Sequence, residues 1–182
     1  MFPPESDRPR IVEPLDRFTK PIIAAINGLA FGGGLEIALA CDIRIAATTA
    51  RFALPEVKIG SMAGSGGTQR LAAVVGPSLA ARMILTGEPI DAERALAAGL
   101  VSELCEPGKL METAMAIAGT IARNAPLAVI ASKRSMRIAA GMHNVEELDF
   151  ERKLFKELAL TEDRAKGRAA FREKRAPVFK GK

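Results

Sequence analysis

The sequence predicts an α/β fold that is followed by an all-helical segment. Three observations predict it: short apolar runs of strand length, glycine-rich turns after them, and a change at Gly108 beyond which apolar residues recur at helical spacing. The 182 residues suffice for one ordinary domain with its own core. We expect an irregular lead-in over residues 1–19, an α/β core over 20–107 and a helical region over 108–182.

The elements are expected in the following order. Residues 1–19 hold four prolines and seven charges without any period, which is typical of an irregular segment. Strands are predicted at residues 21–27, 42–47, 51–54 and 100–104. Short helices are predicted from Gly33 or Gly34 onward, near Thr68 to Val75, from Pro77, and after the N-cap Asp91. Further helices are predicted near 110–121, from Pro126 and from Asn144, the last with a stripe of Phe150, Leu154 and Leu158.

Composition excludes several classes of protein. Hydrophobic residues make up 48% and charged residues 26%, a globular profile that excludes fibres and disordered tails. The longest apolar stretch, residues 29–41, is broken by Glu36 and falls short of the ~20 residues that cross a membrane. The N-terminus MFPPESDRPR lacks the apolar run of a signal peptide. We therefore expect a cytoplasmic protein without a membrane partner.

Cysteine and histidine are too few to build a metal site. The chain has Cys41, Cys105 and His143, so no cluster of nitrogen and sulfur ligands can form, and no metal is expected. Both cysteines are interpreted as buried small apolar residues, although their spacing alone leaves a disulfide open.

The positive charge is concentrated at the C-terminal end. Residues 162–182 hold 8 basic and 3 acidic residues, whereas the two signs balance in the rest of the chain. One interpretation is a solvated helix end, and the other is a site for an anionic ligand such as the phosphates of a cofactor. Nucleic acid is disfavoured, because the chain has no Trp or Tyr and only Phe171 and Phe179 lie among these charges.

The glycine-rich segments do not fit the common phosphate and nucleophile motifs. A P-loop would need Lys where Gly67 stands, and a dinucleotide fingerprint would need Gly where Ile37 stands. A nucleophilic Ser65 would need Gly at position 63, which is Ala63, and His143 would be the only candidate base.

Two glutamates and a glycine turn are the remaining candidates for chemistry. Glu36 has apolar neighbours on both sides, and a buried carboxylate is costly unless it is paired or neutralised. It is either an acid/base group or a member of a core ion pair with Arg44, Arg51 or Arg70. Glu56, after Leu54-Pro55, would by itself be an ordinary surface residue. The N–H near Gly33 could hold an oxyanion, unless the glycines serve only a tight turn.

Several sequence blocks in order resemble the enoyl-CoA hydratase (crotonase) family. They are KPIIAAING (20–28), GGGLE (32–36), CDIR (41–44), FALPE (52–56), GGTQRL (66–71), LTG (85–87), AGLV (98–101) and FREKR (171–175). The resemblance extends from about Lys20 to the C-terminus. It implies a partial crotonase-like ββα superhelix, a C-terminal helical trimerisation region, and a homo-oligomer that is a trimer or a dimer of trimers.

The resemblance also implies the chemistry and the site residues. Glu36 and Glu56 match the two catalytic glutamates that add water to a 2-enoyl-CoA, with Glu36 as base and Glu56 as acid, and Gly33 matches an oxyanion-hole donor. Phe171 and Lys174 match residues that approach the acyl chain and the CoA nucleotide. The coenzyme A thioester is then the substrate, and no metal or redox cofactor is needed.

The family's opening portion, which carries the second oxyanion donor in a Gly-Ala-Asp stretch, has no counterpart in these residues. The chain is a fragment, or its start was assigned late, or the missing half of the site comes from elsewhere. Without the first ββα turns, open strand edges predict low stability or strand borrowing between chains. An enoyl-CoA isomerase and a non-catalytic assembly protein are the alternative functions, with RNA binding by the basic end after them.

Overall fold

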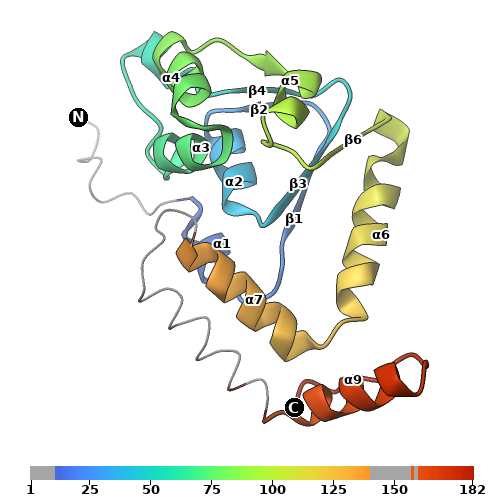
Figure 1. Cartoon of the computed structure of the whole chain (residues 1–182). Coiled ribbons are helices and arrows are strands. Elements are labelled where there is room, and N and C mark those ends of the chain that lie inside the picture. The colour runs from blue at the N-terminus through green and yellow to red at the C-terminus, as the bar shows by residue number, and fades with distance from the viewer. Residues whose placement is uncertain (1–10, 140–156, 158–159) are drawn as a thin grey trace. The chain divides into compact units, whose positions relative to one another are not determined.

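A computed structural model describes residues 11–139, 157 and 160–182 (Figure 1). They form two compact units. The first contains the residues up to Phe18 and Ile22–Ala114, and the second contains Thr19–Pro21 and Met115–Lys182. The boundary predicted from the sequence, between residues 107 and 108, lies before this division along the chain.

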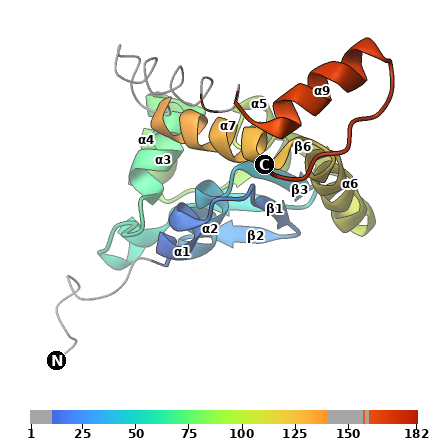
Figure 2. The same ribbon diagram turned by 90° about the horizontal axis from the view of Figure 1, so that it is seen from below.

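The first unit contains two three-stranded sheets. One has the order β1 (Ile23–Ile26), β3 (Ile43–Ala47), β6 (Glu103–Cys105) and is parallel throughout; β1 and β3 run side by side in both views (Figures 1 and 2). The other has the order β2 (Leu29–Phe31), β4 (Arg51–Ala53), β5 (Ile90–Asp91), in which β2 and β4 are parallel and β5 is antiparallel.

Strands β1 to β4 join the two sheets in turn, and a helix follows each pair of strands. It runs β1, β2 and helix α2 (Gly33–Ala40), and then β3, β4 and helix α3 (Gly67–Val75), so each turn is a ββα unit laid parallel to the one before. Parallel strands require such crossover connections, and the short helices provide them. This repeated turn confirms the α/β class and the ββα superhelix that the sequence led us to expect.

The remaining helices of the first unit begin and end where local chemistry predicts. Helix α4 (Pro77–Thr86) starts at a proline and ends at Gly87, which has φ of +64°. Helix α5 (Ala92–Ala97) is capped by Asp91, whose side chain accepts from the Arg94 N–H at 2.8 Å. The others are η2 (Glu56–Ile59) and η3 (Pro107–Lys109), and α6 (Leu110–Ala122) is divided between the two units after Ala114.

The core of this unit lies between the sheets and helices α2 to α5. Its largest fully buried side chains include Phe52, Leu35, Leu54 and Leu71. Half-buried Arg44 donates to the carbonyls of Leu100 (2.6 Å) and Cys41 (2.9 Å), and its burial lowers the pKa of the guanidinium. Both cysteines are free thiols; Cys41 is buried, as expected, and Cys105 is partly buried.

Four elements differ from the sequence-based predictions. Helix α1 (Glu13–Arg17) lies inside the expected irregular lead-in, because a proline in its first turn and the favourable placement of its acidic and basic ends stabilise one helical turn. Strands β2 and β5 were not predicted, since three and two residues are too short to show a period. Strand β6 starts at Glu103, later than the predicted 100–104 segment.

The second unit contains helices α7 (Pro126–Ala139) and α9 (Glu162–Arg172). Helix α7 starts at the proline that predicted it, whereas the helix expected from Asn144 lies outside the described residues. Within the part of the chain that the structure describes, no single helix is long and apolar enough to cross a membrane; only the bent pair Pro107–Ala122 and Pro126–Arg137 passes such a test jointly.

The C-terminal tail of the second unit folds back onto the start of α9. The fully buried Asp163 carboxylate accepts from the N–H groups of Lys180 (2.8 Å) and Gly181 (2.7 Å), and the Asp163 N–H donates to the Lys182 carbonyl (2.9 Å). Burial acts to raise the pKa of Asp163, but these N–H donors and nearby Lys166 outweigh it and lower the pKa below its ordinary value.

Candidate active site

Glu36 enters the core on the first turn of α2. The helix begins at a glycine turn in which Gly32 has φ of +54° and its carbonyl accepts the Glu36 N–H at 3.0 Å. The apolar residues around Glu36 in sequence bury the helix on most sides, and Glu36 is itself only 5% exposed. The sequence therefore predicted the burial of this carboxylate correctly.

Backbone N–H groups hold the Glu36 carboxylate. Its Oε1 accepts from the N–H of Ser65 at 2.6 Å and from the N–H of Gly67 at 2.9 Å. Two donors to one charged oxygen offset much of the cost of removing it from water. Oε2 accepts no hydrogen bond from any described residue, so this oxygen is free to meet a reactant.

The core ion pair considered as an alternative does not form among the described residues. Arg44 donates to backbone carbonyls, Arg70 pairs with Asp16, and Arg51 is exposed. The neighbours of Glu36 are therefore backbone groups of a loop 29 to 31 positions further along the chain.

The loop can approach Glu36 this closely because residue 67 has no side chain. A Cβ on Gly67 would lie 2.9 Å from Glu36 Cγ, 3.0 Å from Glu36 Oε1 and 3.0 Å from the Cβ of Ala63. Gly66, directly before it, has φ of +91° and forms the N-cap of α3. Sequence reasoning missed these two N–H donors, although the GSGG cluster at 64–67 was a signal for close backbone approach.

Glu56 occupies the second position of interest, at the start of η2. Its Oε2 is fully enclosed and has no hydrogen-bond partner among the described residues. Its Oε1 lies 3.2 Å from the point where a Cβ on Gly32 would stand, so the carboxylate rests against the same glycine turn that leads into Glu36. A buried carboxylate oxygen without a partner is rare in a structural role and marks a place for a proton, water or ligand. Glu56 is therefore not the surface residue that its position alone suggested.

Contacts from the two residues after α4 hold η2 in place. Lys58 runs across Gly87, where a Cβ would lie 2.9 Å from Lys58 Cε, and its Nζ pairs with Glu88 Oε1 at 2.7 Å. The hydrogen bond from Lys58 lowers the pKa of the Glu88 carboxyl. The Ser61 N–H closes η2 onto the Glu56 carbonyl at 3.0 Å.

Gly33 supplies a backbone donor at the same turn. It is the first residue of α2, and its N–H has no acceptor among the described residues. Among the described residues, the Cδ1 of Ile11 lies closest to this glycine, 3.1 Å from the position of a Cβ on Gly33. Gly33, Glu36 and Glu56 thus meet around one turn of the first unit, and this arrangement offers a donor for a developing oxyanion beside two carboxylates.

The two C-terminal candidates belong to the second unit. Lys174 is exposed and has φ of +53°, and the side chain of Phe171 lies outside the described part of the chain. Their expected role, contact with the acyl chain and the CoA nucleotide, therefore stays a prediction.

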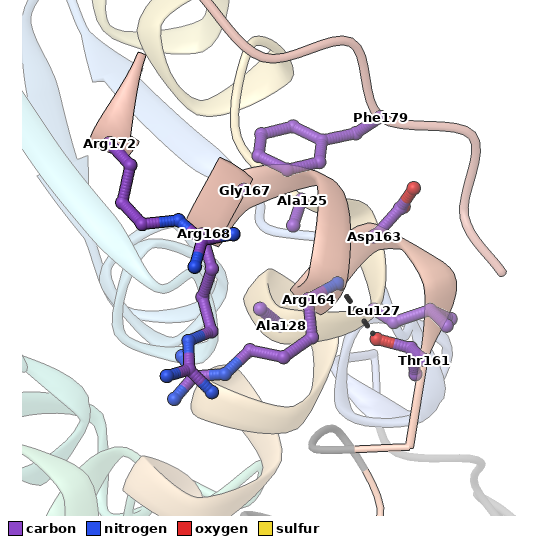
Figure 3. Close-up of a pocket in the computed structure, with 10 residues that line it drawn as sticks. All are labelled: Ala125, Leu127, Ala128, Thr161, Asp163, Arg164, Gly167, Arg168, Arg172 and Phe179. Atoms are coloured by element: carbon purple, nitrogen blue, oxygen red, sulfur yellow. Dashed lines mark hydrogen bonds between the residues drawn. The ribbon is translucent and has the colours of Figure 1, made fainter. Parts of the chain in front are cut away.

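The second unit contains a separate pocket of about 510 Å³ between α7, α9 and the C-terminal tail (Figure 3). Phe179, Leu127 and Ala128 are among its apolar lining residues, and Arg164, Arg168 and Arg172 are its arginines. Its shape at Thr161 is fixed by a hydrogen bond from the Arg164 N–H to the Thr161 hydroxyl, at 3.2 Å. Of the candidate residues predicted from the sequence, Gly33, Glu36, Glu56 and Lys174 are not among its described lining residues. Within the described residues no group of three His, Cys, Asp or Glu side chains could hold a metal.

Comparison with known proteins identifies relatives along almost the whole chain. A profile described as enoyl-CoA hydratase/isomerase matches residues 10–182. The chain is 47% identical to a 2,3-dehydroadipyl-CoA hydratase of Escherichia coli over 96% of its own length and 69% of that protein. It is 51% identical to an (E)-benzylidenesuccinyl-CoA hydratase of Thauera aromatica over 89% of its length and 63% of the relative.

Solved structures of similar fold belong to the same family as these relatives. An enoyl-CoA hydratase of Bacillus anthracis superimposes with a TM-score of 0.91 at 40% identity, over 94% of this chain and 66% of the other. A Geobacillus kaustophilus structure described as an enoyl-CoA hydratase subunit gives 0.90 at 43% identity with the same coverage. The fold is therefore the crotonase fold. The chain spans between 57% and 69% of the length of four curated relatives that it matches.

Proposed function

This chain belongs to the enoyl-CoA hydratase/isomerase family, and from that premise we propose that it works as an enoyl-CoA hydratase. The reaction is the syn addition of water to the double bond of a 2-enoyl-CoA, which gives a 3-hydroxyacyl-CoA. Relatives at similar identity are named as hydratases of several different acyl-CoA substrates, so the acyl group is not part of the proposal.

Glu36 is the proposed base. Because its Oε1 is occupied by two N–H groups, Oε2 is the oxygen that takes a proton from water as the water oxygen bonds to the β-carbon. The electrons of the double bond then move toward the thioester, whose carbonyl oxygen becomes an enolate oxygen. The N–H of Gly33 donates to that oxygen.

Glu56 is the proposed acid. As the general acid it gives a proton to the α-carbon, which collapses the enolate and restores the thioester. The cycle closes when the proton gained by Glu36 returns to Glu56 through solvent. Only protons move, so the proposed chemistry needs neither a metal nor a redox cofactor.

One observation carries this proposal above the others: the enclosed, unpartnered Oε2 of Glu56 beside the turn that carries Gly33 and Glu36. A role in proton transfer to a substrate would give a use to this oxygen, which has no partner among the described residues. Family resemblance supports the rest of the proposal, namely Phe171 and Lys174 near the acyl chain and the CoA nucleotide, a trimer or dimer of trimers, and the cytoplasm as compartment.

The test is the loss of enoyl-thioester absorbance when the purified chain meets crotonyl-CoA in water. Glu36→Gln and Glu56→Gln should each lower kcat by about 10²–10⁴-fold, the usual contribution of a general acid or base. Glu112→Gln, at an exposed ion pair, is the matched control and should leave the rate unchanged. Full hydration by Glu56→Gln would contradict the proposal.

The same variants separate the alternatives. An isomerase would move the double bond of a 3-enoyl-CoA and would depend mainly on one of the two glutamates. Binding of CoA thioesters without turnover would favour an assembly role.

A further inference from the structure

We propose that Arg70, acting together with Asp16, is a positioning residue of this site: it fixes the Ser65–Gly67 backbone that holds the carboxylate of Glu36. The inference rests on the proposed function, because it is the role of Glu36 as base that gives this geometry a consequence for rate.

The contacts form a chain from Asp16 to Glu36. Arg70 Nη1 donates to the Ser65 carbonyl at 2.9 Å, and Nη2 donates to both carboxylate oxygens of Asp16, at 2.7 and 2.8 Å. The N–H groups of the same loop bind Glu36, since Ser65 and Gly67 both donate to Glu36 Oε1. The loop therefore lies between the guanidinium of Arg70 and the carboxylate of Glu36.

Gly66 shows how tightly the guanidinium supports the loop. A Cβ at Gly66 would lie 2.9 Å from Arg70 Nη1 and 3.3 Å from Arg70 Cζ, and the residue has φ of +91°. The planar group fills the space under the turn, and the turn has the conformation that glycine adopts without strain. If Arg70 moved, the carbonyl of Ser65 would lose its hydrogen bond, and the N–H groups of Ser65 and Gly67 would no longer be held in their present orientation.

Asp16 connects this support to the helix on which Glu36 lies. It belongs to α1, which packs against α2 and is anchored by the fully buried Val12. The loop is thus fixed to α2 by two routes, directly at Glu36 and indirectly through Arg70, Asp16 and α1. Two routes restrict the Glu36 carboxylate more than either would alone.

The exposure of the pair distinguishes positioning from stability. The Arg70 and Asp16 side chains are 30% and 39% exposed, and ion pairs this accessible contribute little to folding free energy. The orientation of the guanidinium is nevertheless well defined. It donates to two carboxylate oxygens of Asp16 and to the carbonyl of Ser65, and three such hydrogen bonds fix the plane of the group. We therefore expect its loss to change the rate much more than the stability.

The decisive variant is Asp16→Asn, which keeps the shape and removes the charge. Its matched control is Glu13→Gln, which breaks the exposed ion pair with Arg17 on the same helix. With crotonyl-CoA, Asp16→Asn should lower kcat by about tenfold to 10²-fold, the cost of a misplaced catalytic group. KM should stay within about twofold, because the proposal gives neither residue a contact with substrate. Asp16→Glu should recover most of the loss, and the unfolding midpoint should match that of Glu13→Gln.

A second readout does not depend on activity. The amide hydrogens of Ser65 and Gly67 are protected by their hydrogen bonds to Glu36, so Asp16→Asn and Arg70→Lys should both speed hydrogen exchange in peptides that cover 63–67. Peptides from α4 should exchange as in the wild type. Equal exchange in the wild type and both variants would overturn the inference.

A double variant tests the route of action. If Asp16 acts through Glu36, adding Asp16→Asn to Glu36→Gln should lower the residual rate no further. A further tenfold loss in that background would overturn the inference. An inactive wild-type chain would instead contradict the proposed hydratase function, and faster exchange in Asp16→Asn would in that case still support the positioning contact.

Discussion

Replacing Gly67 with alanine tests the closest approach in the site. The new Cβ would lie 2.9 Å from Glu36 Cγ and 3.0 Å from both Glu36 Oε1 and Ala63 Cβ, all inside ordinary contact distance. The loop or the carboxylate must move, which costs about 1–3 kcal/mol as overpacking. If the Gly67 N–H leaves Glu36, the lost bond to a charged group adds about 1.5–3 kcal/mol. When both costs apply, we expect the free energy of unfolding to fall by about 2.5–6 kcal/mol, with hydration lost as well.

The assay is urea unfolding followed by circular dichroism, in which a lower midpoint at unchanged slope reports lost stability. Gly64→Ala is the matched control in the same loop, because a Cβ there meets nothing within 4 Å and its φ is not in the left-handed region. It should change stability by no more than about 0.5 kcal/mol in either direction. Equal midpoints for the two variants would refute the close approach of the loop to Glu36.

Three further changes test other parts of the fold. The folded pKa of Asp163 lies below its ordinary value, so its hydrogen bonds to the C-terminal tail are complete at neutral pH and are lost as pH falls through that lowered pKa. Proteolysis within residues 176–182 should therefore rise in acid. Asp163→Asn should raise it already at neutral pH. Asp91→Ala should cost about 1 kcal/mol in urea unfolding through loss of the α5 cap, with Asp91→Ser near wild type. Phe52→Ala, at a fully buried position, should cost about 3–5 kcal/mol, and a loss below 1 would show that its contacts are not part of the core.

The burial of Glu36 could be predicted from sequence, whereas its partners could not. Apolar neighbours on both sides of Glu36 require a buried helix whatever the rest of the fold. Its donors, however, are N–H groups of Ser65 and Gly67, and every residue except proline carries such a group. Sequence reasoning looked for a charged partner among the arginines, because only side chains are visible in a sequence.

The position of Glu56 shows a second limit. Its enclosure depends on a glycine 24 positions earlier, Gly32, and on the packing of η2 against α4, which are tertiary facts. The order of strands, glycine turns and helices was readable because each has a local signal. Strands β2 and β5 have none, and they form only because β4 offers them a partner on each side.

The Glu36 carboxylate is held by backbone N–H groups. At one of the two donor positions, the hydrogen bond therefore does not depend on which side chain the residue carries. Substitution at Ser65 by another small residue leaves the donor in place, whereas proline alone removes it. At Gly67 proline would remove the donor, and any side chain would collide with Glu36. In a saturation library, position 65 should thus tolerate a range of small residues and position 67 none. Two positions separated by one residue would then differ in tolerance although both donate to the same oxygen.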